Sequence, residues 1–314
     1  MNSFIFSFEP PPHWERFCAS HRALFHSPSW QKLIDTTLGS TSIYGWSENG
    51  EFGLAINIFR AGIFRVGYLG FPAGGLVGDH RLSQETASRL AQADFPTALH
   101  CLRIPTSAFD TTLTLDLPHA GAPETAIIDL QKWRLENHSD IRRDINKVNR
   151  AGLEIVGNPD AVLADAAYRL YRETVGRNKG NLRYKPGYFQ ALARLSETHP
   201  ALRFLFALKD KQVAGFAVVA LHGDTVYYLH GGTEPAYRRH SPSDLLLYEA
   251  IRWAQERGAS CFNLMSSPSK QASLINYKEK WGGVTREHLT YTLPIKSWHC
   301  RAFLGVEKLY QLLR

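Results

Sequence analysis

Two arginines stand directly before a predicted helix, in an arrangement that can hold a phosphate group. Arg238 and Arg239 precede the stretch 241–258, in which Ser241 is the expected N-cap. The first turn of a helix has N–H groups without acceptors and the positive end of the helix dipole, and both attract anions. We therefore predict that the two arginines and the helix start, with Ser243, bind a phosphate-bearing donor. Solvated loop arginines are the alternative interpretation.

The strand predicted before this loop, TVYYLHGG at 225–232, ends in a glycine pair. Gly231 and Gly232 can bring backbone N–H groups close to a reacting carbonyl, because glycine has no side chain to obstruct the approach. We predict that this pair contacts the donor. A simple bulge or strand end is the alternative.

His230 is the predicted general base for a proton released near this strand. It alternates with Tyr228, so both side chains are expected on the same face, and imidazole titrates close to neutral pH. Tyr228 itself, Asp244 and Glu249 lie nearby in the sequence and are further candidates. A packed, hydrogen-bonded histidine is the alternative interpretation of His230.

Several of these residues carry a family resemblance. The loop 238–243 resembles the Arg/Gln-x-x-Gly-x-Gly/Ala loop of the GNAT acyltransferase superfamily, with serine at both glycine positions. YKEKWGG at 277–283 resembles the Phe/Tyr-Lys-x-x-Trp-Gly motif of the Fem-type branch, which includes the peptidoglycan aminoacyl transferases. The stretches 139–155 and 171–192 are also similar to that branch. The resemblance covers about 139–294.

The resemblance implies an N-acyltransferase that moves an acyl or aminoacyl group from an activated donor to an amine. An acyl-CoA thioester is the expected donor, as a co-substrate and not as a tightly bound cofactor; aminoacyl-tRNA is the alternative donor. The serines in the loop argue against a plain acetyl-CoA enzyme. The resemblance also implies that Lys278 holds a substrate phosphate and developing charge, beside Tyr277 as a substrate contact. A non-catalytic ligand-binding module on a GNAT scaffold is the rival function.

A basic helix is predicted at 139–152. Arg143 and Lys147 share one face of it and are candidate contacts for an anionic acceptor or for RNA phosphates. A solvated amphipathic face is the simpler explanation.

Composition sets the class of protein. The chain has 314 residues, a net charge of +7 and four cysteines without CxxC spacing, which indicates neither a zinc site nor a disulfide framework. The positive charge suits an anionic donor. The N-terminus lacks the pattern of a signal peptide, and no apolar run is long enough to span a membrane. We therefore expect a cytoplasmic protein without a metal or stable membrane insertion; its oligomeric state and amine acceptor stay open.

The order of predicted elements indicates an α/β (α+β) fold of two GNAT-like lobes. Each lobe is expected to have a mixed, mainly antiparallel sheet of its own, flanked by helices. Residues 1–122 form the first lobe, with a hairpin turn at Asn49-Gly50, and 123–295 form the second, which holds the donor loop. Residues 296–314 are predicted to be an amphipathic helical tail.

Overall fold

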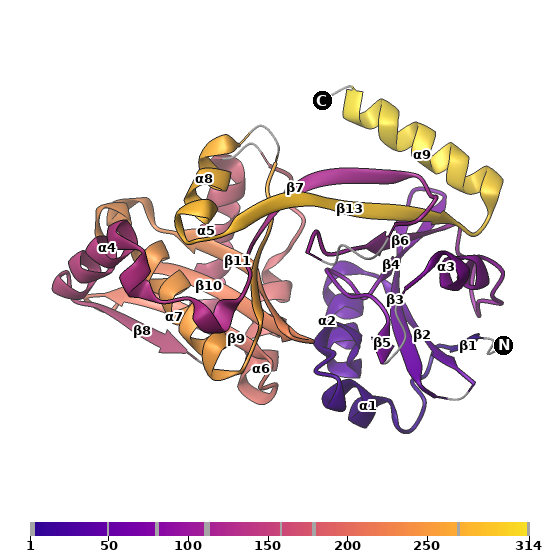
Figure 1. The fold of residues 1–314 in the computed structure, drawn as a ribbon, viewed down its shortest axis with the longest axis horizontal. Coiled ribbons are helices and arrows are strands. Elements are labelled where there is room, and N and C mark those ends of the chain that lie inside the picture. The colour runs from indigo at the N-terminus through magenta and orange to yellow at the C-terminus, as the bar shows by residue number, and fades with distance from the viewer. Residues whose placement is uncertain are drawn as a thin grey trace. The chain divides into compact units, whose positions relative to one another are not determined.

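The computed structural model describes residues 4–48, 50–78, 82–109, 114–157, 159–177, 180–268 and 271–312. The chain divides into two compact units: unit 1 comprises Met1–Ala122 and Glu287–Arg314, and unit 2 comprises Pro123–Arg286. The colours of Figure 1 show unit 1 at both ends of the chain and unit 2 between them. No helix in the described ranges is long and apolar enough to cross a membrane.

Unit 1 is built on strands paired in the order β1-β2-β3-β4-β6-β13, with β5 added to β3 (Figure 1). The strands are β1 (Phe4–Ser7), β2 (Thr41–Ser47), β3 (Phe52–Ala61), β4 (Phe64–Leu69), β5 (Val77–Gly78), β6 (Cys101–Pro105) and β13 (Val284–Pro294), the last entering from unit 2. The helices are α1 (Trp14–Ser20), α2 (Pro28–Leu38), α3 (Gln84–Ala91) and α9 (Ser297–Leu312).

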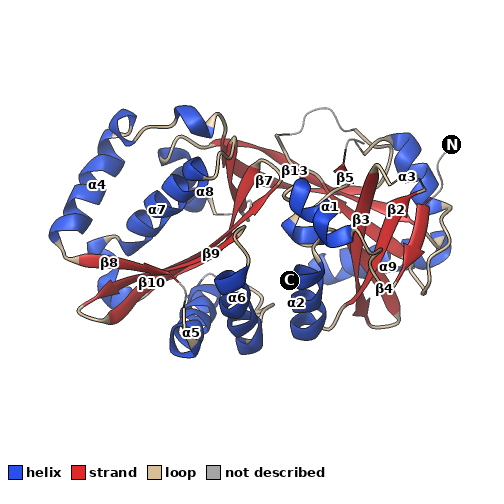
Figure 2. Cartoon of the chain, turned by 90° about the horizontal axis from the view of Figure 1, so that it is seen from below, coloured by secondary structure: helices blue, strands red, loops and turns tan. Residues whose placement is uncertain are grey.

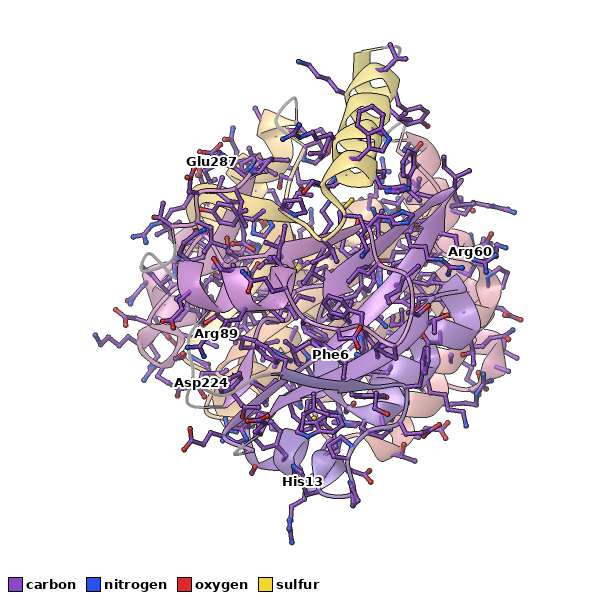
Figure 3. The ribbon with its side chains drawn as sticks, turned by 90° about the vertical axis from the view of Figure 1, so that its right-hand side faces the viewer. Phe6, His13, Arg60, Arg89, Asp224 and Glu287 are labelled. Atoms are coloured by element: carbon purple, nitrogen blue, oxygen red, sulfur yellow. The ribbon has the colours of Figure 1, made fainter. Side chains whose placement is uncertain are left out.

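The predicted hairpin is present as the antiparallel pair β2–β3, which runs in register from Thr41↔Ile58 to Trp46↔Gly53. Its predicted turn includes Asn49, which lies outside the described residues. Aliphatic side chains of β2, β3, β4 and β6 fill the core behind this pair. At its edge Phe6 of β1, labelled in Figure 3, lies against Phe95 with the ring centroids 4.6 Å apart.

The C-terminal residues join unit 1, which corrects the predicted boundaries at 295 and 296. Residues Thr290 to Pro294 of β13 pair antiparallel with β6, and α9 packs Cys300 against Cys101 and Val66. Arg103 of β6 also forms an ion pair with Glu307 of α9. Strand pairing and burial therefore attach 287–314 to the first unit, and neither leaves a marked signal in the local sequence.

Unit 2 has strands paired in the order β7-β12-β11-β10-β9-β8. They are β7 (His119–Ile127), which begins in unit 1, β8 (Leu153–Gly157), β9 (Leu202–Lys209), β10 (Gln212–His222), β11 (Thr225–Thr233) and β12 (Cys261–Ser266). The helices are α4 (Ser139–Arg150), α5 (Ala161–Arg177), α6 (Pro186–Thr198), α7 (Pro242–Glu256) and α8 (Ala272–Lys280), and a 3-10 turn at Pro235–His240 leads into α7.

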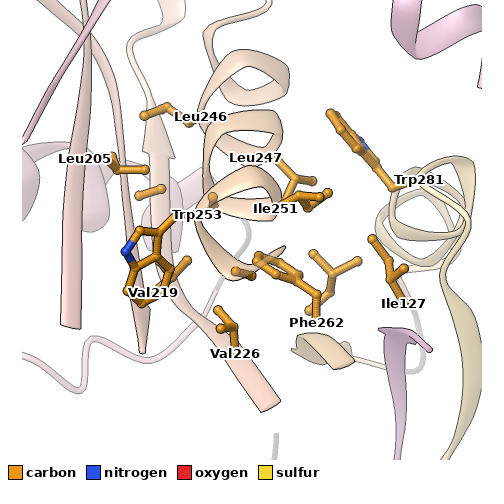
Figure 4. Close-up of a cluster of buried hydrophobic side chains, with 14 of the residues drawn as sticks. Ile127, Leu205, Val219, Val226, Leu246, Leu247, Ile251, Trp253, Phe262 and Trp281 are labelled. Atoms are coloured by element: carbon orange, nitrogen blue, oxygen red, sulfur yellow. The ribbon is translucent and has the colours of Figure 1, made fainter. Parts of the chain in front are cut away.

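The sheet of unit 2 has helices on both faces, with α5 and α6 on one side and α4 and α7 on the other (Figure 2). The α7 side holds a large core to which the strands contribute Leu205, Val219 and Val226 and the helix Leu246 and Ile251 (Figure 4). Alternation along the strands therefore sends one set of side chains toward α7 and the other toward α5 and α6.

Both units contain a strand, a helix and a second strand parallel to the first. In unit 1 these are β4, α3 and β6, and in unit 2 they are β11, α7 and β12. The prediction of mixed, mainly antiparallel strands flanked by helices is confirmed. The expectation of two separate sheets is wrong in one respect: β7 and β13, which both cross from one unit to the other along the chain, are hydrogen-bonded neighbours.

Candidate functional site

The site begins where two parallel strands of unit 2 part. β11 pairs with β12 only from Thr225↔Cys261 to Tyr227↔Asn263. Beyond Tyr227, no described strand pairs with β11 on that side, although β10 continues to pair on the other. The backbone edge of β11 is therefore available for hydrogen bonds to a ligand, because an unpaired strand edge keeps free N–H and C=O groups.

A pocket of about 480 Å³ lies at this divergence, within unit 2. It draws on β11, the loop before α7, the first turns of α7, the end of β12, and α5 and α8. Its lining residues are Thr174, Arg177, Phe216, Tyr228, Gly231, Gly232, Thr233, Arg238, Ser241, Pro242, Ser243, Asp244, Leu247, Leu264, Leu274, Tyr277 and Lys278. Apolar walls and a few charged groups are typical of a small-molecule site.

Most of the predicted donor residues meet in this pocket. Gly231, Gly232, Arg238, Ser241 and Ser243 all line it. Arg239 lies outside that lining among the described residues, and its Nε donates to His240 Nε2 at 3.1 Å. The two arginines therefore differ: the first faces the pocket and the second lies on the surface beside it.

The start of α7 differs from the predicted N-cap. Ser241 adopts the left-handed conformation, with φ 50°, and its side chain makes no capping hydrogen bond to the described residues. Its carbonyl accepts from the Asp244 N–H at 3.0 Å, and its own N–H donates to the Arg238 carbonyl at 3.0 Å. A serine in this conformation costs about 1 kcal/mol or more relative to glycine, and strain of this kind gathers at functional sites.

Neither glycine of the pair has room for a side chain, because another residue lies close on each face of β11. A Cβ on Gly231 would lie 2.1 Å from the Tyr228 hydroxyl, and one on Gly232 would lie 2.8 Å from the Phe216 ring. Both glycines stay in register with β10, opposite Ala217 and Phe216. β11 ends at Thr233, so the pair lies near the strand end, as in the alternative interpretation, and it also lets the wall of the pocket approach closely.

The prediction that His230 shares a face with Tyr228 is wrong. The β10–β11 register shifts between Val218 and Val219, which face His230 and Tyr228 respectively. One extra residue of β11 is accommodated there, and a β-bulge of this kind reverses the alternation of side chains. Tyr228 therefore reaches the pocket, whereas His230 points toward α6.

His230 is buried in an aromatic cluster away from the pocket lining. The Tyr188 hydroxyl lies 3.0 Å from its Nε2, and the rings of Tyr184 and Phe189 lie 4.7 and 5.5 Å from it. Burial, with a smaller effect of the Arg183 charge, lowers the pKa of His230 to about 3. These contacts match the alternative interpretation of a packed, hydrogen-bonded histidine.

Of the other candidate bases, Asp244 lies in the pocket lining and Glu249 does not. Asp244 lines the pocket and accepts a hydrogen bond from the Tyr277 hydroxyl at 3.0 Å, whereas Glu249 pairs with Arg252 farther along α7. Burial raises the pKa of Asp244, and the hydrogen bond from Tyr277 opposes part of that rise. A carboxylate that lines the pocket beside Tyr228 and Tyr277, with a pKa raised by burial, is a candidate general base.

Lys278 lines the pocket and is itself buried. Its Nζ donates to the Met265 carbonyl at 2.7 Å and to Ser267 Oγ at 2.8 Å. Burial lowers the pKa of Lys278 to about 8, and the charge of Glu124 opposes this effect. Both the ammonium and the neutral amine are therefore accessible near physiological pH.

The segment that carries Lys278 is held by Trp281. That indole is fully buried and stacks on Trp133, with the ring centroids 6.1 Å apart, and Trp133 Nε1 donates to the Trp281 carbonyl at 2.8 Å. Lys280, two residues from Lys278, pairs instead with Asp144 of α4 at 2.7 Å. The two lysines of the YKEKWGG motif thus have different surroundings.

The predicted substrate contacts on α4 do not line the pocket among the described residues. Arg143 and Lys147 lie on the exposed side of the helix, where Arg143 contacts Asp140 at 3.5 Å. The opposite side, with Ile141 and Ile145, packs into the core. The helix is an amphipathic element with a solvated basic face.

Two polar lining residues on α5, Thr174 and Arg177, were absent from the predicted site. Arg177 Nη2 donates to Thr174 Oγ1 at 3.0 Å, so both lie together at the pocket. Their segment is within the Fem-like stretch 171–192, which was the available signal. Sequence spacing alone cannot show that the end of α5 reaches β11. No group of three or more potential metal ligands gathers within the described ranges.

Comparison with known proteins finds a similarity in the second unit. No curated protein matches the chain. The family described as Acetyltransferase (GNAT) domain matches residues 136–279, a range that includes β11, α7, β12 and Lys278. The match lies within unit 2 and covers less than half of the chain.

The chain as a whole has a fold seen in several solved structures. The crystal structure of FemX aligns with a TM-score of 0.63 at 13% identity, over 91% of this chain and 96% of FemX. L-PGS from Bacillus licheniformis aligns with a TM-score of 0.57 at 15% identity, over 96% and 97%. A tandem GNAT protein from the clavulanic acid biosynthesis pathway gives 0.51 at 12% identity, over 94% and 99%. The Fem-like fold expected from the motifs is confirmed.

Proposed function

We propose that the chain is an N-acyltransferase, which moves an acyl or aminoacyl group from an activated donor to an amine. The observation that carries this proposal is the pocket at the divergence of β11 and β12, where Arg238, the start of α7 and Lys278 meet. The GNAT domain match over 136–279 supports the same reaction class.

An acyl-CoA thioester is the donor that we favour. Its pyrophosphate suits Arg238, Arg177 and the N-terminal end of α7, because cations and an open helix start both stabilise phosphate. Its acyl group suits the apolar part of the lining, formed by Leu247, Leu264 and Leu274 among others. The thioester carbonyl would then meet the unpaired edge of β11.

The chemistry asked of the protein is modest. The amine nitrogen forms a bond to the carbonyl carbon, the carbon–sulfur bond breaks, and the proton lost by the amine balances the thiolate that leaves. Backbone N–H groups of β11 can stabilise the intermediate oxyanion. A protonated Lys278 has three N–H donors, of which two are used by Met265 and Ser267, so the third is available to developing negative charge. Asp244 is the group in the pocket suited to accept the proton.

Aminoacyl-tRNA is the second candidate donor, and the exposed basic face of α4 is the observation that favours it. Arg142, Arg143, Lys147 and Arg150 are all exposed along that helix. RNA binding through such a face would weaken steeply with salt, because each phosphate contact releases counterions. Binding of CoA in the pocket would depend on salt much less.

A thermal-shift experiment separates these possibilities. CoA, an acyl-CoA, aminoacyl-tRNA and a nucleotide-sugar precursor are each added to the protein, and the melting temperature is measured. A ligand at about 100 times its Kd adds about 2.7 kcal/mol of stability, which is readily detected. We expect acyl-CoA to raise the melting temperature and Arg238→Ala to weaken that effect. Stabilisation by tRNA alone would make the RNA-dependent reaction the better proposal.

A second measurement tests catalysis itself. The protein that binds acyl-CoA is mixed with a panel of amines, and free thiol is measured over time. Release of thiol that requires an amine supports the transferase. Binding without thiol release across the panel would instead favour a ligand-binding module on a GNAT scaffold.

A further inference from the structure

The end of β12 has an irregular backbone next to Lys278. Asn263 pairs with Ala126 of β7, but the next pair is Ser266 with Glu124, so β12 contains one extra residue over this interval. Met265, inside the interval, has φ 63°, in the left-handed region that residues other than glycine adopt at a cost. A conformation of this kind persists only when its surroundings enforce it.

Asn263 enforces the turn from within the same strand. Its side-chain oxygen Oδ1 accepts a hydrogen bond from the Met265 N–H at 2.7 Å. Local bonds of this type allow an asparagine to stabilise a backbone reversal two residues on. The turn directs the Met265 carbonyl to Lys278 Nζ, at 2.7 Å.

Glu124 determines which way the Asn263 amide is oriented. Asn263 Nδ2 donates to Glu124 Oε1 at 3.0 Å, and both side chains are buried. An ionised carboxylate only accepts hydrogen bonds, so it selects the NH2 end of the amide and leaves Oδ1 for Met265. Glu124, Asn263, Met265 and Lys278 therefore form a continuous hydrogen-bonded chain.

The same carboxylate acts on Lys278 through its charge. Burial lowers the pKa of Lys278, and the negative charge of Glu124 on β7 opposes that change. Of the other titratable groups in this lining, Tyr277 of α8 donates a hydrogen bond to Asp244 of α7, and Tyr228 of β11 lies with them. Within the described part of the chain, Glu124 is thus the charged group that acts on this lysine.

We propose that Glu124 is a positioning residue for Lys278: it orients Asn263, which holds the turn at Met265 against the lysine, and its negative charge acts on the same amine. This role rests on the proposed acyl transfer only in its effect on turnover. Its effect on the lysine itself can be measured without any substrate.

The test uses the rate at which an amine-reactive reagent labels Lys278, followed by peptide mass spectrometry across a pH series. Glu124→Gln keeps an oxygen that can accept from Asn263 but removes the charge. Because only the neutral amine reacts, loss of a stabilising negative charge should move the labelling midpoint to lower pH, by about one unit. Glu197→Gln, an exposed glutamate on α6, is the matched control and should not move it.

Turnover provides the second readout. A midpoint that falls by one unit from about 8 leaves roughly a fifth of the original ammonium at pH 8. We therefore expect Glu124→Gln to lose about fivefold in kcat at pH 8 and to recover most of it at pH 6. An unchanged labelling midpoint in a folded Glu124→Gln protein overturns the proposal, whether or not the chain is an acyltransferase.

Asn263→Ala tests the geometric half of the proposal and decides it even if Glu124→Gln does not fold. The substitution removes the hydrogen bonds that link Glu124 to Met265 through Asn263, but it keeps the negative charge of Glu124. We expect the fold-loss in kcat to be the same at pH 6 and at pH 8. The substitution displaces the Lys278 amine but does not change its protonation. Turnover equal to that of the unaltered protein at both pH values would overturn the positioning role.

Discussion

The two units contain equivalent helix starts that are built in opposite ways. In unit 1, α3 follows β4, and Ser83 caps it by accepting from the Thr86 N–H at 3.1 Å in an extended conformation. In unit 2, α7 follows β11, and Ser241 occupies the same position in a left-handed conformation without a side-chain cap among the described residues. A serine precedes both helices, yet only Ser83 caps its helix through the side chain.

This difference explains why the pocket lies in unit 2. A capped first turn has its N–H groups satisfied, so it offers little to a ligand. In α7 the Asp244 N–H donates to the Ser241 carbonyl and Pro242 has no N–H, so the Ser243 N–H, beside Arg238, is the first-turn group that we propose to meet an anion. We propose that the same supersecondary unit is a structural element in unit 1 and a binding element in unit 2.

The largest predicted effect concerns Lys278, which makes unit 2 chemically distinct. Lys278→Met should reduce kcat by about 100-fold or more, since it removes a donor to developing charge. It should also lower stability by about 1–3 kcal/mol, because Met265 O and Ser267 Oγ lose their partner. Steady-state kinetics and thermal unfolding measure the two effects separately.

Lys280→Met is the matched control for Lys278→Met. It removes the same charge two residues away, from a pair with Asp144 that is partly exposed. Such pairs contribute at most about 1 kcal/mol, so stability should change little and kcat should stay within about twofold. Equal losses of turnover in the two variants would mean that neither lysine is part of the site.

The next effect concerns the arginines beside the two helices. Arg238→Ala should weaken binding of CoA by about tenfold, with a smaller loss at high salt, because it removes a charge-assisted phosphate contact. Arg239→Ala should have a smaller effect, since its side chain bonds His240 outside the lining. Isothermal titration calorimetry at two salt concentrations measures both.

Arg89→Ala on α3 provides the control from unit 1. Arg89, labelled in Figure 3, pairs with Glu85 on the surface of that helix. Its removal should leave CoA binding unchanged. A loss of affinity as large as that from Arg238→Ala would mean that α3 of unit 1 also contributes to phosphate binding. It would contradict the proposed difference between the two helices.

The smallest effects concern the two serines. Ser83→Ala should lower stability by about 1 kcal/mol, as lost N-caps do, whereas Ser241→Ala should cost less because no capping bond is removed. Ser241→Gly should raise stability by up to about 1 kcal/mol, since glycine tolerates a positive φ. Urea unfolding measures all three. A larger loss from Ser241→Ala than from Ser83→Ala would contradict the capping difference.

Much of the architecture could be predicted from the sequence. Period-two alternation and a terminal glycine pair identify β11, and Pro242 with the apolar periodicity after it identifies α7. The YKEKWGG stretch identifies Lys278 and its neighbouring tryptophan. These signals are local, so residues close in the sequence are sufficient to produce them.

The surroundings of those residues could not be predicted in the same way. Alternation placed His230 beside Tyr228, but a single bulge opposite Val218 and Val219 sends the histidine into the aromatic cluster around Tyr188. Residue preference made Ser241 a cap, but the approach of the preceding loop requires a left-handed backbone there. Each wrong prediction comes from the backbone conformation of a single residue, which changes the direction of a side chain.

Sequence by itself therefore determined the elements and the types of chemical group, because helix and strand periodicity, caps and motifs act over a few residues. Only the tertiary structure decided which groups meet. Asn263 and Glu124 are 139 residues apart, and strand pairing between β12 and β7 brings their side chains within 3.0 Å. The pKa of Lys278 likewise depends on burial and on a carboxylate from a distant strand. Contacts of this kind exist only after the chain has folded, so no local pattern records them.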